Sequence, residues 1–390
     1  MMKFKMLTLF FLMIGISACG SDIPTDIEEI EEPIPFVSDV SSDSQSLPMA
    51  FEEYLQGKME EDHIPGMAVA LVDKDGIIYA QGFGLRNVER NLPVTQDTLF
   101  HIGSTQKSMT AMLIATLVDD GYFEWDTPVI KIMPDFELSD PEATQQVTFR
   151  HLLSMRAGIS EDAEDEIDPD GSFEDLLDAT AESEILDLPG KVFEYSNLSA
   201  SLAGYLGALA VDEDTEDLHA AYAKLLKERI LTPIGMSTAT IYLSEAQNSE
   251  NFAYSYALSS DNEPVLTETY DVEGDILAPS GSLKASATEM GLYIQTQLNR
   301  GLAPNGMRVV SEQNLTETWK PYLEDYAMGW ESKTHQGITL IVHEGAYDDF
   351  MSVIGFMPDE NLGFVILINS EETGAITEEA PLILAELLSE

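Results

Sequence analysis

The chain has 390 residues, of which 44% are hydrophobic, and 70 acidic side chains against 19 lysines and arginines give a formal net charge of −51. This charge excludes a nucleic-acid partner, because phosphate backbones bind clustered Lys and Arg side chains and repel a polyanion. The length fits one large domain or two or three smaller ones, and the single cysteine excludes an internal disulfide and a cysteine-rich metal site.

The first residues of the chain resemble a bacterial lipoprotein signal. Residues 1–5 carry two lysines, residues 6–18 are almost wholly apolar, and small residues directly precede Cys19. The apolar run is shorter than the roughly 20 residues of a membrane-spanning helix, so 1–18 is expected to be a cleaved signal peptide. Cys19 would then be lipidated and would tether the protein to the bacterial cell envelope, on its periplasmic or outer surface, without a membrane span. The alternative is an ordinary secretory signal with a chance cysteine.

The segment after this cysteine, 19–47, is predicted to be an acidic flexible linker. Residues 20–47 hold eight Asp and Glu, several Pro and Ser, and no basic residue. Such a composition buries too little apolar surface to fold alone, so the segment is interpreted as a solvated spacer. The folded domain is expected over 48–390.

The domain begins with a helix and a hairpin. Apolar residues at helical spacing predict a helix over 49–61. Two strand-like runs, 67–72 and 77–83, follow, and Asp73-Lys74-Asp75-Gly76 between them is a hairpin sequence. A long helix is predicted from about Ser104 until Gly121 stops it.

Helical patterns dominate the middle of the chain. Residues from about 140 to 249 are mostly helical by pattern, with helices predicted over 198–210 and 218–230. The acidic stretch 161–170 lacks the spacing of an EF-hand and is interpreted as a solvated loop. A further helix is predicted over 286–299.

The C-terminal part changes to a strand period. Strand-like runs at 338–342, 351–357 and 363–368 are separated by short acidic turns, and an amphipathic helix over 376–388 closes the chain.

Strands at both ends with helices between them imply an α+β fold. We expect an antiparallel sheet that is flanked by helices and carries an inserted all-helical subdomain. The sheet would come from about 48–100 and 325–390, and the helical part from about 101–300.

Ser104-Thr105-Gln106-Lys107 opens the long helix and is the only Ser-x-x-Lys in the chain. A three-residue step puts the hydroxyl and the amine on neighbouring faces of the first turn, where the helix N-terminus favours developing negative charge. A serine must lose its proton as it attacks, and burial can lower the pKa of a lysine enough for it to accept that proton. The motif therefore predicts a nucleophile and its base, against the plain alternative of a serine helix cap.

Tyr195-Ser196-Asn197 lies in a loop that leads into a helix. Such a loop can point a phenol and a carboxamide into a cleft, which would supply a second proton carrier and a group that orients the substrate. The alternative is a half-buried aromatic residue followed by a helix cap.

His343-Glu344-Gly345-Ala346 ends a strand-like run. Gly345 would let a substrate approach the strand closely, and the N–H groups of Ala346 and Ser104 could bind a developing oxyanion. The alternative is a structural histidine. Lys333-Thr334 is a rival third motif, but a turn is expected there and it ranks below His343.

In this order, the three motifs resemble the serine β-lactamase and penicillin-binding-protein superfamily. The resemblance runs from about 49 to 390 and is nearest to the branch of class C β-lactamases, related DD-peptidases and esterases. Further matching stretches are Gly66-Met67-Ala68-Val69-Ala70, Gly82-Phe83-Gly84, Asp97-Thr98-Leu99-Phe100, His151-Leu152-Leu153-Ser154, Leu231-Thr232-Pro233-Ile234-Gly235-Met236 and Met328-Gly329-Trp330.

The resemblance implies a role for each matching residue. Ser104 would be the acylated nucleophile, and Lys107 and Tyr195 would share the general base and acid work, with the main base left open between them. Asn197 would orient the substrate, and the N–H groups of Ser104 and Ala346 would form the oxyanion hole.

Two departures from the family pattern bear on the substrate. His343, expected to be catalytic, stands where many members have the lysine of a Lys-Thr-Gly motif. Unlike a lysine, a histidine is only partly protonated at neutral pH. Ser154-Met155-Arg156-Ala157-Gly158 stands where relatives often read Ser-His-Thr-Ser-Gly. Because His-x-Gly is common in the peptidases and esterases, the sequence predicts an esterase or D-amino-acid peptidase in preference to a β-lactamase.

The sequence thus predicts an envelope-anchored serine hydrolase that acts on small-molecule or peptide esters and amides. The alternative from another class is a non-catalytic, penicillin-binding-like module that binds the cell wall, and the intact motifs argue against it. No cofactor or metal is expected, since a His-Glu-x-x-His helix and a glycine-rich phosphate loop are both missing from the sequence.

Overall fold

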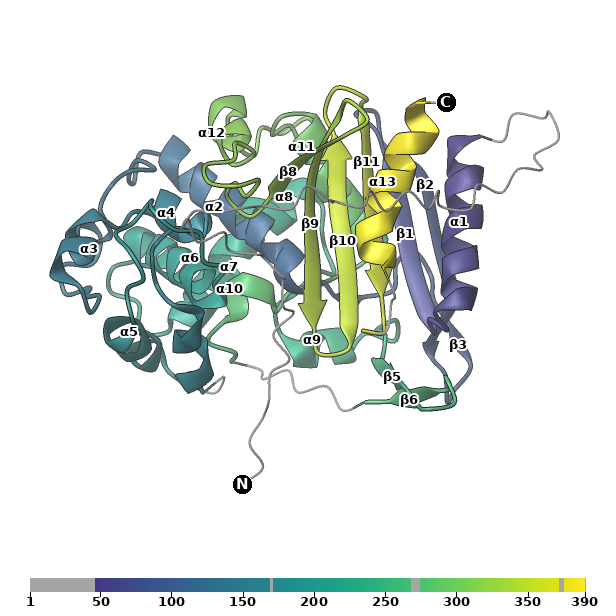
Figure 1. Cartoon of the computed structure of the whole chain (residues 1–390), viewed down its shortest axis with the longest axis horizontal. Coiled ribbons are helices and arrows are strands. Elements are labelled where there is room, and N and C mark those ends of the chain that lie inside the picture. The colour runs from purple at the N-terminus through teal and green to yellow at the C-terminus, as the bar shows by residue number, and fades with distance from the viewer. Residues whose placement is uncertain (1–45, 169–170, 268–273, 372–374, 390) are drawn as a thin grey trace, which may run out of the picture. The chain divides into compact units, whose positions relative to one another are not determined.

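A seven-stranded antiparallel sheet joins the two ends of the folded region, in the strand order β3-β2-β1-β11-β10-β9-β8 (Figure 1). The strands are β1 (Gly66–Val72), β2 (Ile77–Asn87), β3 (Leu92–Pro93), β8 (Glu331–His335), β9 (Ile338–Tyr347), β10 (Phe350–Met357) and β11 (Leu362–Ile368). The first and last strands in sequence meet at the centre, where β1 pairs with β11 from Met67 opposite Ile368 to Val72 opposite Gly363. Together with the helices, this sheet confirms the expected α+β fold class.

The computed structural model describes residues 46–168, 171–267, 274–371 and 375–389. The expected signal peptide, Cys19 and nearly all of the expected linker lie outside these ranges. Within the described residues, none of the helices is both long enough and apolar enough to cross a membrane.

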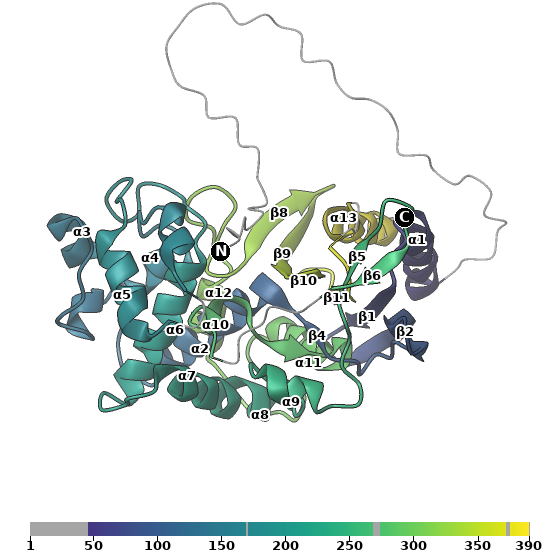
Figure 2. The same cartoon turned by 90° about the horizontal axis from the view of Figure 1, so that it is seen from below.

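Two helices cover one face of the sheet. They are α1 (Leu47–Glu61) and α13 (Ile376–Ser389), which lie side by side in both views (Figures 1 and 2). Side chains alternate across a strand, so Met67, Val69 and Leu71 of β1 pack with these helices in one apolar cluster. The C-terminal helix thus belongs to the same layer as the N-terminal one.

The opposite face packs against α2 (Gln106–Asp119) and α11 (Ala287–Leu298). Ala68, Ala70 and Val72 of β1 point to this side. Because both faces are covered, every residue of β1 is buried, and the strand is a continuous apolar run.

The remaining helices form a layer beyond α2, away from the sheet (Figure 1). They include α3 (Pro141–Gln146), α4 (Phe149–Leu153), α5 (Phe173–Glu182), α6 (Asn197–Val211) and α7 (Leu218–Leu226), with 3₁₀ turns η2 (Val129–Lys131) and η3 (Glu161–Glu166) and a π turn η4 (Lys227–Leu231). The short helix α8 (Thr232–Ile234) follows η4 and ends beside α11. Short elements complete the chain: β4 (Phe100–His101), α9 (Leu243–Gln247), β5 (Tyr256–Leu258), β6 (Pro264–Leu266), α10 (Ala278–Gly281), β7 (Lys284–Ala285) and α12 (Glu312–Glu317).

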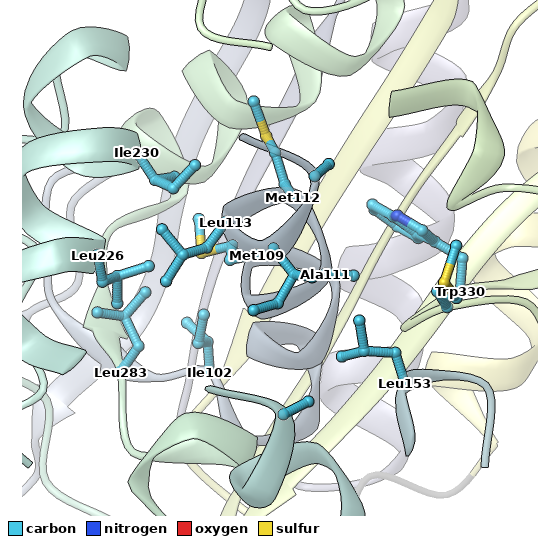
Figure 3. Packing of buried hydrophobic residues seen from close by; sticks show 14 of the residues in the cluster. Ile102, Met109, Ala111, Met112, Leu113, Leu153, Leu226, Ile230, Leu283 and Trp330 are labelled. Atoms are coloured by element: carbon cyan, nitrogen blue, oxygen red, sulfur yellow. The ribbon is translucent and has the colours of Figure 1, made fainter. Parts of the chain in front are cut away.

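Helix α2 is buried on all sides because it lies between the sheet and this helical layer. Every residue from Gln106 to Leu117 is buried. Leu226, Ile230 and Leu283 contact one side of it, and Trp330 lies on another (Figure 3). The N-terminus of α2 is therefore held rigidly from several directions, and it carries the Ser-x-x-Lys motif.

Two expectations about local structure were wrong. Lys333-Thr334 lies in β8, an edge strand of the sheet, and not in a turn. An edge strand with one exposed side can be polar, so its residues do not show the apolar run of the inner strands. The acidic stretch begins with the 3₁₀ turn η3, and one of its side chains, Glu164, is half-buried instead of fully solvated.

Candidate active site

A short 3₁₀ turn, η1 (Gly103–Thr105), presents Ser104 at the start of α2. Gly103 has a φ of +51°, and a Cβ atom there would lie 2.5 Å from the carbonyl oxygen of Ala346. Only glycine fits this backbone conformation and this close approach to β9. The Thr105 hydroxyl donates to the Ile102 carbonyl at 2.7 Å, which fixes the turn from within. The sequence therefore places Ser104 at a point where the start of α2 and strand β9 touch.

Lys107 follows one turn later, and its amine is enclosed by hydrogen-bond partners. Its Nζ lies 2.8 Å from Ser104 Oγ, 2.6 Å from Asn197 Oδ1 and 3.2 Å from the Ser280 carbonyl oxygen. The side chain is only 1% exposed. This burial lowers the pKa of Lys107 to about 7, against an opposing contribution from the charge of Glu164.

The three partners also define how a neutral Lys107 would be bonded. A neutral amine has two hydrogens and one lone pair, and a backbone carbonyl such as that of Ser280 can only accept. Asn197 presents its oxygen, because its Nδ2 donates to Glu164 at 2.9 Å. With both hydrogens used on these acceptors, the lone pair points to the Ser104 hydroxyl. The geometry suits proton transfer from Ser104 to Lys107.

Tyr195 lies on the other side of the amine. Lys107 Nζ is 4.8 Å from the centre of the Tyr195 ring, and Tyr195 makes a hydrogen bond with Ser104. The side chain is 36% exposed, yet the protein atoms around its hydroxyl raise the pKa of Tyr195 above its ordinary value, and the bond with Ser104 opposes this only in part. The phenol is therefore protonated at neutral pH, when Lys107 is partly neutral.

His343 faces this site from β9 but has both ring nitrogens engaged elsewhere. Tyr326 lies 3.0 Å from Nε2, and Nδ1 contacts the carbonyl of Glu344. A carbonyl only accepts, so Nδ1 carries the proton and Nε2 accepts from the Tyr326 hydroxyl. Burial lowers the pKa of His343 to about 4, so the ring is neutral. The ring centres of His343 and Tyr195 are 6.4 Å apart.

The backbone expected to form an oxyanion hole is also at the site. A Cβ atom on Gly345 would lie 2.3 Å from the Ile102 carbonyl and 3.0 Å from the Ser104 nitrogen, so β9 reaches the nucleophile turn only because residue 345 is glycine. Ala346 is exposed beside it. The structure thus brings together Ser104, Lys107, Tyr195, Asn197, His343, Gly345 and Ala346.

The sequence reasoning missed two polar residues here, Glu164 and Tyr326. Glu164 accepts from Asn197 Nδ2 and, at 3.0 Å, from the backbone N–H of Leu198 at the start of α6. The apolar residues Ala163 and Ile167 indicate that part of this acidic stretch faces inward, but they do not single out Glu164. Nothing in the sequence links Tyr326 to the histidine 17 residues later.

The rival motif lies on β8, beyond His343. Lys333 is paired with Glu331 of the same strand at 2.5 Å. The charges of both residues act on His343, so this pair belongs to the rim of the site.

Comparisons with known proteins identify the family of this chain. Residues 51–388 match a family model described as Beta-lactamase. The chain is 29% identical to the Unguisins hydrolase ungD' of Aspergillus campestris over 86% of this chain and 64% of that protein, and 26% identical to Protein flp of Staphylococcus aureus over 87% and 66%. It therefore spans slightly less than two thirds of the length of these relatives.

Solved structures share the fold. An octameric penicillin-binding protein homologue from Pyrococcus abyssi is 25% identical with a TM-score of 0.72, covering 87% of this chain and 77% of its own. The D-alanine carboxypeptidase AmpC from Burkholderia cenocepacia is 20% identical with a TM-score of 0.69, covering 88% and 98%, which is evidence for the fold alone. With the family match over most of its length, the chain belongs to the beta-lactamase family, and it has the fold and the Ser-x-x-Lys pair of that family's serine hydrolases.

Proposed function

We propose that this protein is a serine hydrolase that forms an acyl-enzyme on Ser104 with ester or amide substrates. The observation that carries the proposal is the buried Lys107 amine 2.8 Å from Ser104 Oγ, with its other two partners both acceptors. A pKa of about 7 gives Lys107 a substantial neutral fraction at neutral pH. Lys107 is therefore the main general base in this proposal, and the protonated Tyr195 is the acid.

In the acylation step, Lys107 accepts the Ser104 proton as Oγ attacks the substrate carbonyl. The N–H groups of Ser104 and Ala346 bind the oxyanion, and Asn197 orients the substrate. Tyr195 then protonates the leaving alkoxide or amine and regains a proton from Lys107. Water attacks the acyl-enzyme in the second step by the same proton transfers in reverse, which restores Ser104.

The charges around the site favour substrates without a carboxylate next to the scissile bond. His343 is neutral, Glu164 and Glu331 act on the reacting groups, and Lys333 is already paired with Glu331. β-Lactams and the C-terminal ends of D-alanyl peptides carry such a carboxylate. At this site it would be repelled by the glutamates, or would have to compete with Glu331 for Lys333. An esterase, or a peptidase for uncharged D-amino-acid linkages, is thus preferred over a β-lactamase.

Ser104→Ala tests the proposal directly. It is expected to abolish turnover of short-chain aryl esters and labelling by a serine-directed fluorophosphonate, while Ser108→Ala, the next serine along α2, serves as the control for labelling. Turnover by a folded Ser104→Ala protein would refute the proposal. Stoichiometric binding of wall fragments by the wild type without turnover or labelling would support the non-catalytic module.

A panel of aryl esters, D-alanyl peptides and a chromogenic cephalosporin separates the substrate classes. We expect the aryl esters to have the highest kcat/KM. A cephalosporin hydrolysed well above the esters would make the protein a β-lactamase.

We also propose that Cys19 anchors the protein to the cell envelope through lipid. The support is the signal-like pattern of residues 1–18 and the acidic segment that follows. Cys19→Ser is expected to move the protein from the membrane fraction to the soluble fraction and to prevent incorporation of labelled palmitate. Equal palmitate incorporation by both proteins would refute the anchor.

A further inference from the structure

Glu164 touches the catalytic network from a segment that the active-site motifs do not include. Its carboxylate accepts from Asn197 Nδ2 at 2.9 Å with one oxygen and from the backbone N–H of Leu198 at 3.0 Å with the other. Two donors on neighbouring residues hold both oxygens, so the carboxylate has a fixed orientation. A chain of contacts then runs from Glu164 through the Asn197 amide to Lys107 Nζ at 2.6 Å.

The amide in the middle of this chain has two possible orientations, and they differ chemically. A carboxylate can only accept, so Glu164 selects the orientation in which Asn197 directs its nitrogen to η3 and its oxygen to Lys107. In the opposite orientation, the amide would direct N–H groups at Lys107 and compete for the lone pair that must accept the Ser104 proton. The position of one carboxylate thus determines whether Lys107 faces an acceptor or a donor.

Glu164 also brings a negative charge close to Lys107. The other groups around the amine are Tyr195, which is protonated, His343, which is neutral and acts from β9, and α10, whose four residues have no ionisable side chain. Of the residues that the structure describes, Glu164 is the one whose charge stabilises the ammonium form of Lys107. Helix α6, which Glu164 meets at its first residues, has no acidic residue in its first turn, so the charge of Glu164 also stabilises this helix end.

We propose that Glu164 is a positioning residue for the acylation of Ser104: it fixes the Asn197 amide with its oxygen towards Lys107, and its negative charge lies behind that amide. This role rests on the proposed function and adds a residue that acts only through Asn197 and Lys107. Glutamine separates charge from orientation, because its one oxygen can still accept from Asn197 Nδ2 while the charge and the acceptor for the Leu198 N–H are lost. Alanine removes the charge and both acceptors.

The test is the rate at which a fluorophosphonate labels Ser104 in the full-length protein between pH 5 and pH 9. In the wild type, the rate should rise with pH as Lys107 loses its proton. Glu164→Gln should move the midpoint of this rise to lower pH, because the ammonium form loses a favourable charge, with a maximal rate within about threefold of the wild type. Glu164→Ala should lower the maximal rate at least about tenfold, as misplacement of catalytic groups does.

Asp162→Asn, an exposed position on the same turn, is the matched control and should leave both the midpoint and the maximal rate unchanged. A Glu164→Gln midpoint at or above the wild-type value would overturn the proposal, and so would a wild-type maximal rate in Glu164→Ala. If Glu164→Ala does not fold, the pH midpoint of Glu164→Gln alone decides whether the proposal stands. Failure of the wild type to be labelled at Ser104 would instead refute the proposed hydrolase function.

Discussion

Two cations in this protein, the buried Lys107 and the half-buried Arg150, have opposite surroundings. Lys107 contacts a hydroxyl, an amide oxygen and a carbonyl, and its pKa is lowered to about 7. Arg150 on α4 pairs with Glu317 at 2.6 Å and Asp126 at 2.7 Å, and although burial opposes it, these carboxylates raise its pKa above the ordinary value. Burial lowers the pKa of both groups, but only Arg150 has carboxylates in direct contact that outweigh it.

The contrast between the partners of Arg150 and Lys107 shows how one fold can hold one cation charged and bring another close to neutrality. Carboxylates in direct contact hold Arg150 charged, and the pair ties α4 to α12 across the molecule. The only acid acting on Lys107 among the described residues does so from behind the Asn197 amide. Burial keeps the pKa of Lys107 near 7, where the amine can accept a proton, and the intervening amide separates it from the one described carboxylate that opposes this.

Replacing Lys107 should lower activity and spare stability, whereas replacing Arg150 should lower stability and spare activity. Lys107→Met should lower kcat/KM for an aryl ester by about 10²–10⁴-fold, the range for loss of a general base. Its melting temperature should stay close to that of the wild type, because an apolar side chain replaces a buried amine that is already partly neutral. Ester kinetics and thermal unfolding measure the two effects, and substantial activity in Lys107→Met would break the comparison.

Placing a carboxylate in contact with Lys107 should hold its amine in the charged form, as the carboxylates around Arg150 hold that side chain charged. Asn197→Asp puts an oxygen that can carry charge 2.6 Å from Nζ, which should raise the pKa of Lys107 and lower kcat/KM at pH 7 about tenfold, with recovery towards pH 9. Asn197→Ala is the control, since it removes the contact without adding charge. A pH profile for Asn197→Asp that matches that of Asn197→Ala would show that contact with charge is not what separates the two cations.

Arg150→Met should affect stability and spare catalysis. It leaves Glu317 without a partner it holds at 2.6 Å, and we expect a loss of about 1–3 kcal/mol in the free energy of unfolding, measured in urea. The value of kcat/KM should stay within about threefold. A drop in activity with unchanged stability would contradict the structural role assigned to Arg150.

The same pair predicts an acid-dependent part of stability. Burial opposes ionisation of Glu317, but hydrogen bonds from Lys320, Tyr322 and Arg150 lower its pKa to about 2. A pKa below the unfolded value, about 4.3, means that the carboxylate stabilises the fold above pH 4.3 and loses this effect as the pH falls towards 2. The difference in urea stability between the wild type and Glu317→Gln should therefore shrink over that interval, and a constant difference would contradict it.

The smallest expected effect concerns the surface that surrounds both sites. A net charge of −51 opposes compaction, and salt screens such repulsion over about 8–10 Å at 0.1–0.15 M. The melting temperature should rise by a few degrees between millimolar and about 1 M sodium chloride. High salt should reduce the Arg150→Met loss in part, because Asp126 is exposed whereas Glu317 is half-buried. No change or a fall in melting temperature would count against salt screening of the surface.

Features that depend on the spacing of neighbouring residues along the chain could be predicted from the sequence. The three-residue step from Ser104 to Lys107 and Gly345 of β9 could be identified from motifs, and the apolar inner strands from their runs. The strand β8 could not, because an edge strand has no continuous apolar pattern. Glu164 could not either, because its carboxylate meets a residue 33 positions away, and one inward acid looks like its solvated neighbours.

The protonation state of Lys107 is the central claim, and an NMR titration of its labelled side-chain Cε tests it most directly. The Lys107 signal, assigned by its loss in Lys107→Met, should shift with a midpoint near pH 7, well below the value of about 10.4 for an unperturbed lysine. A midpoint for Lys107 above pH 10 in the folded protein would show a permanently charged amine and contradict the account.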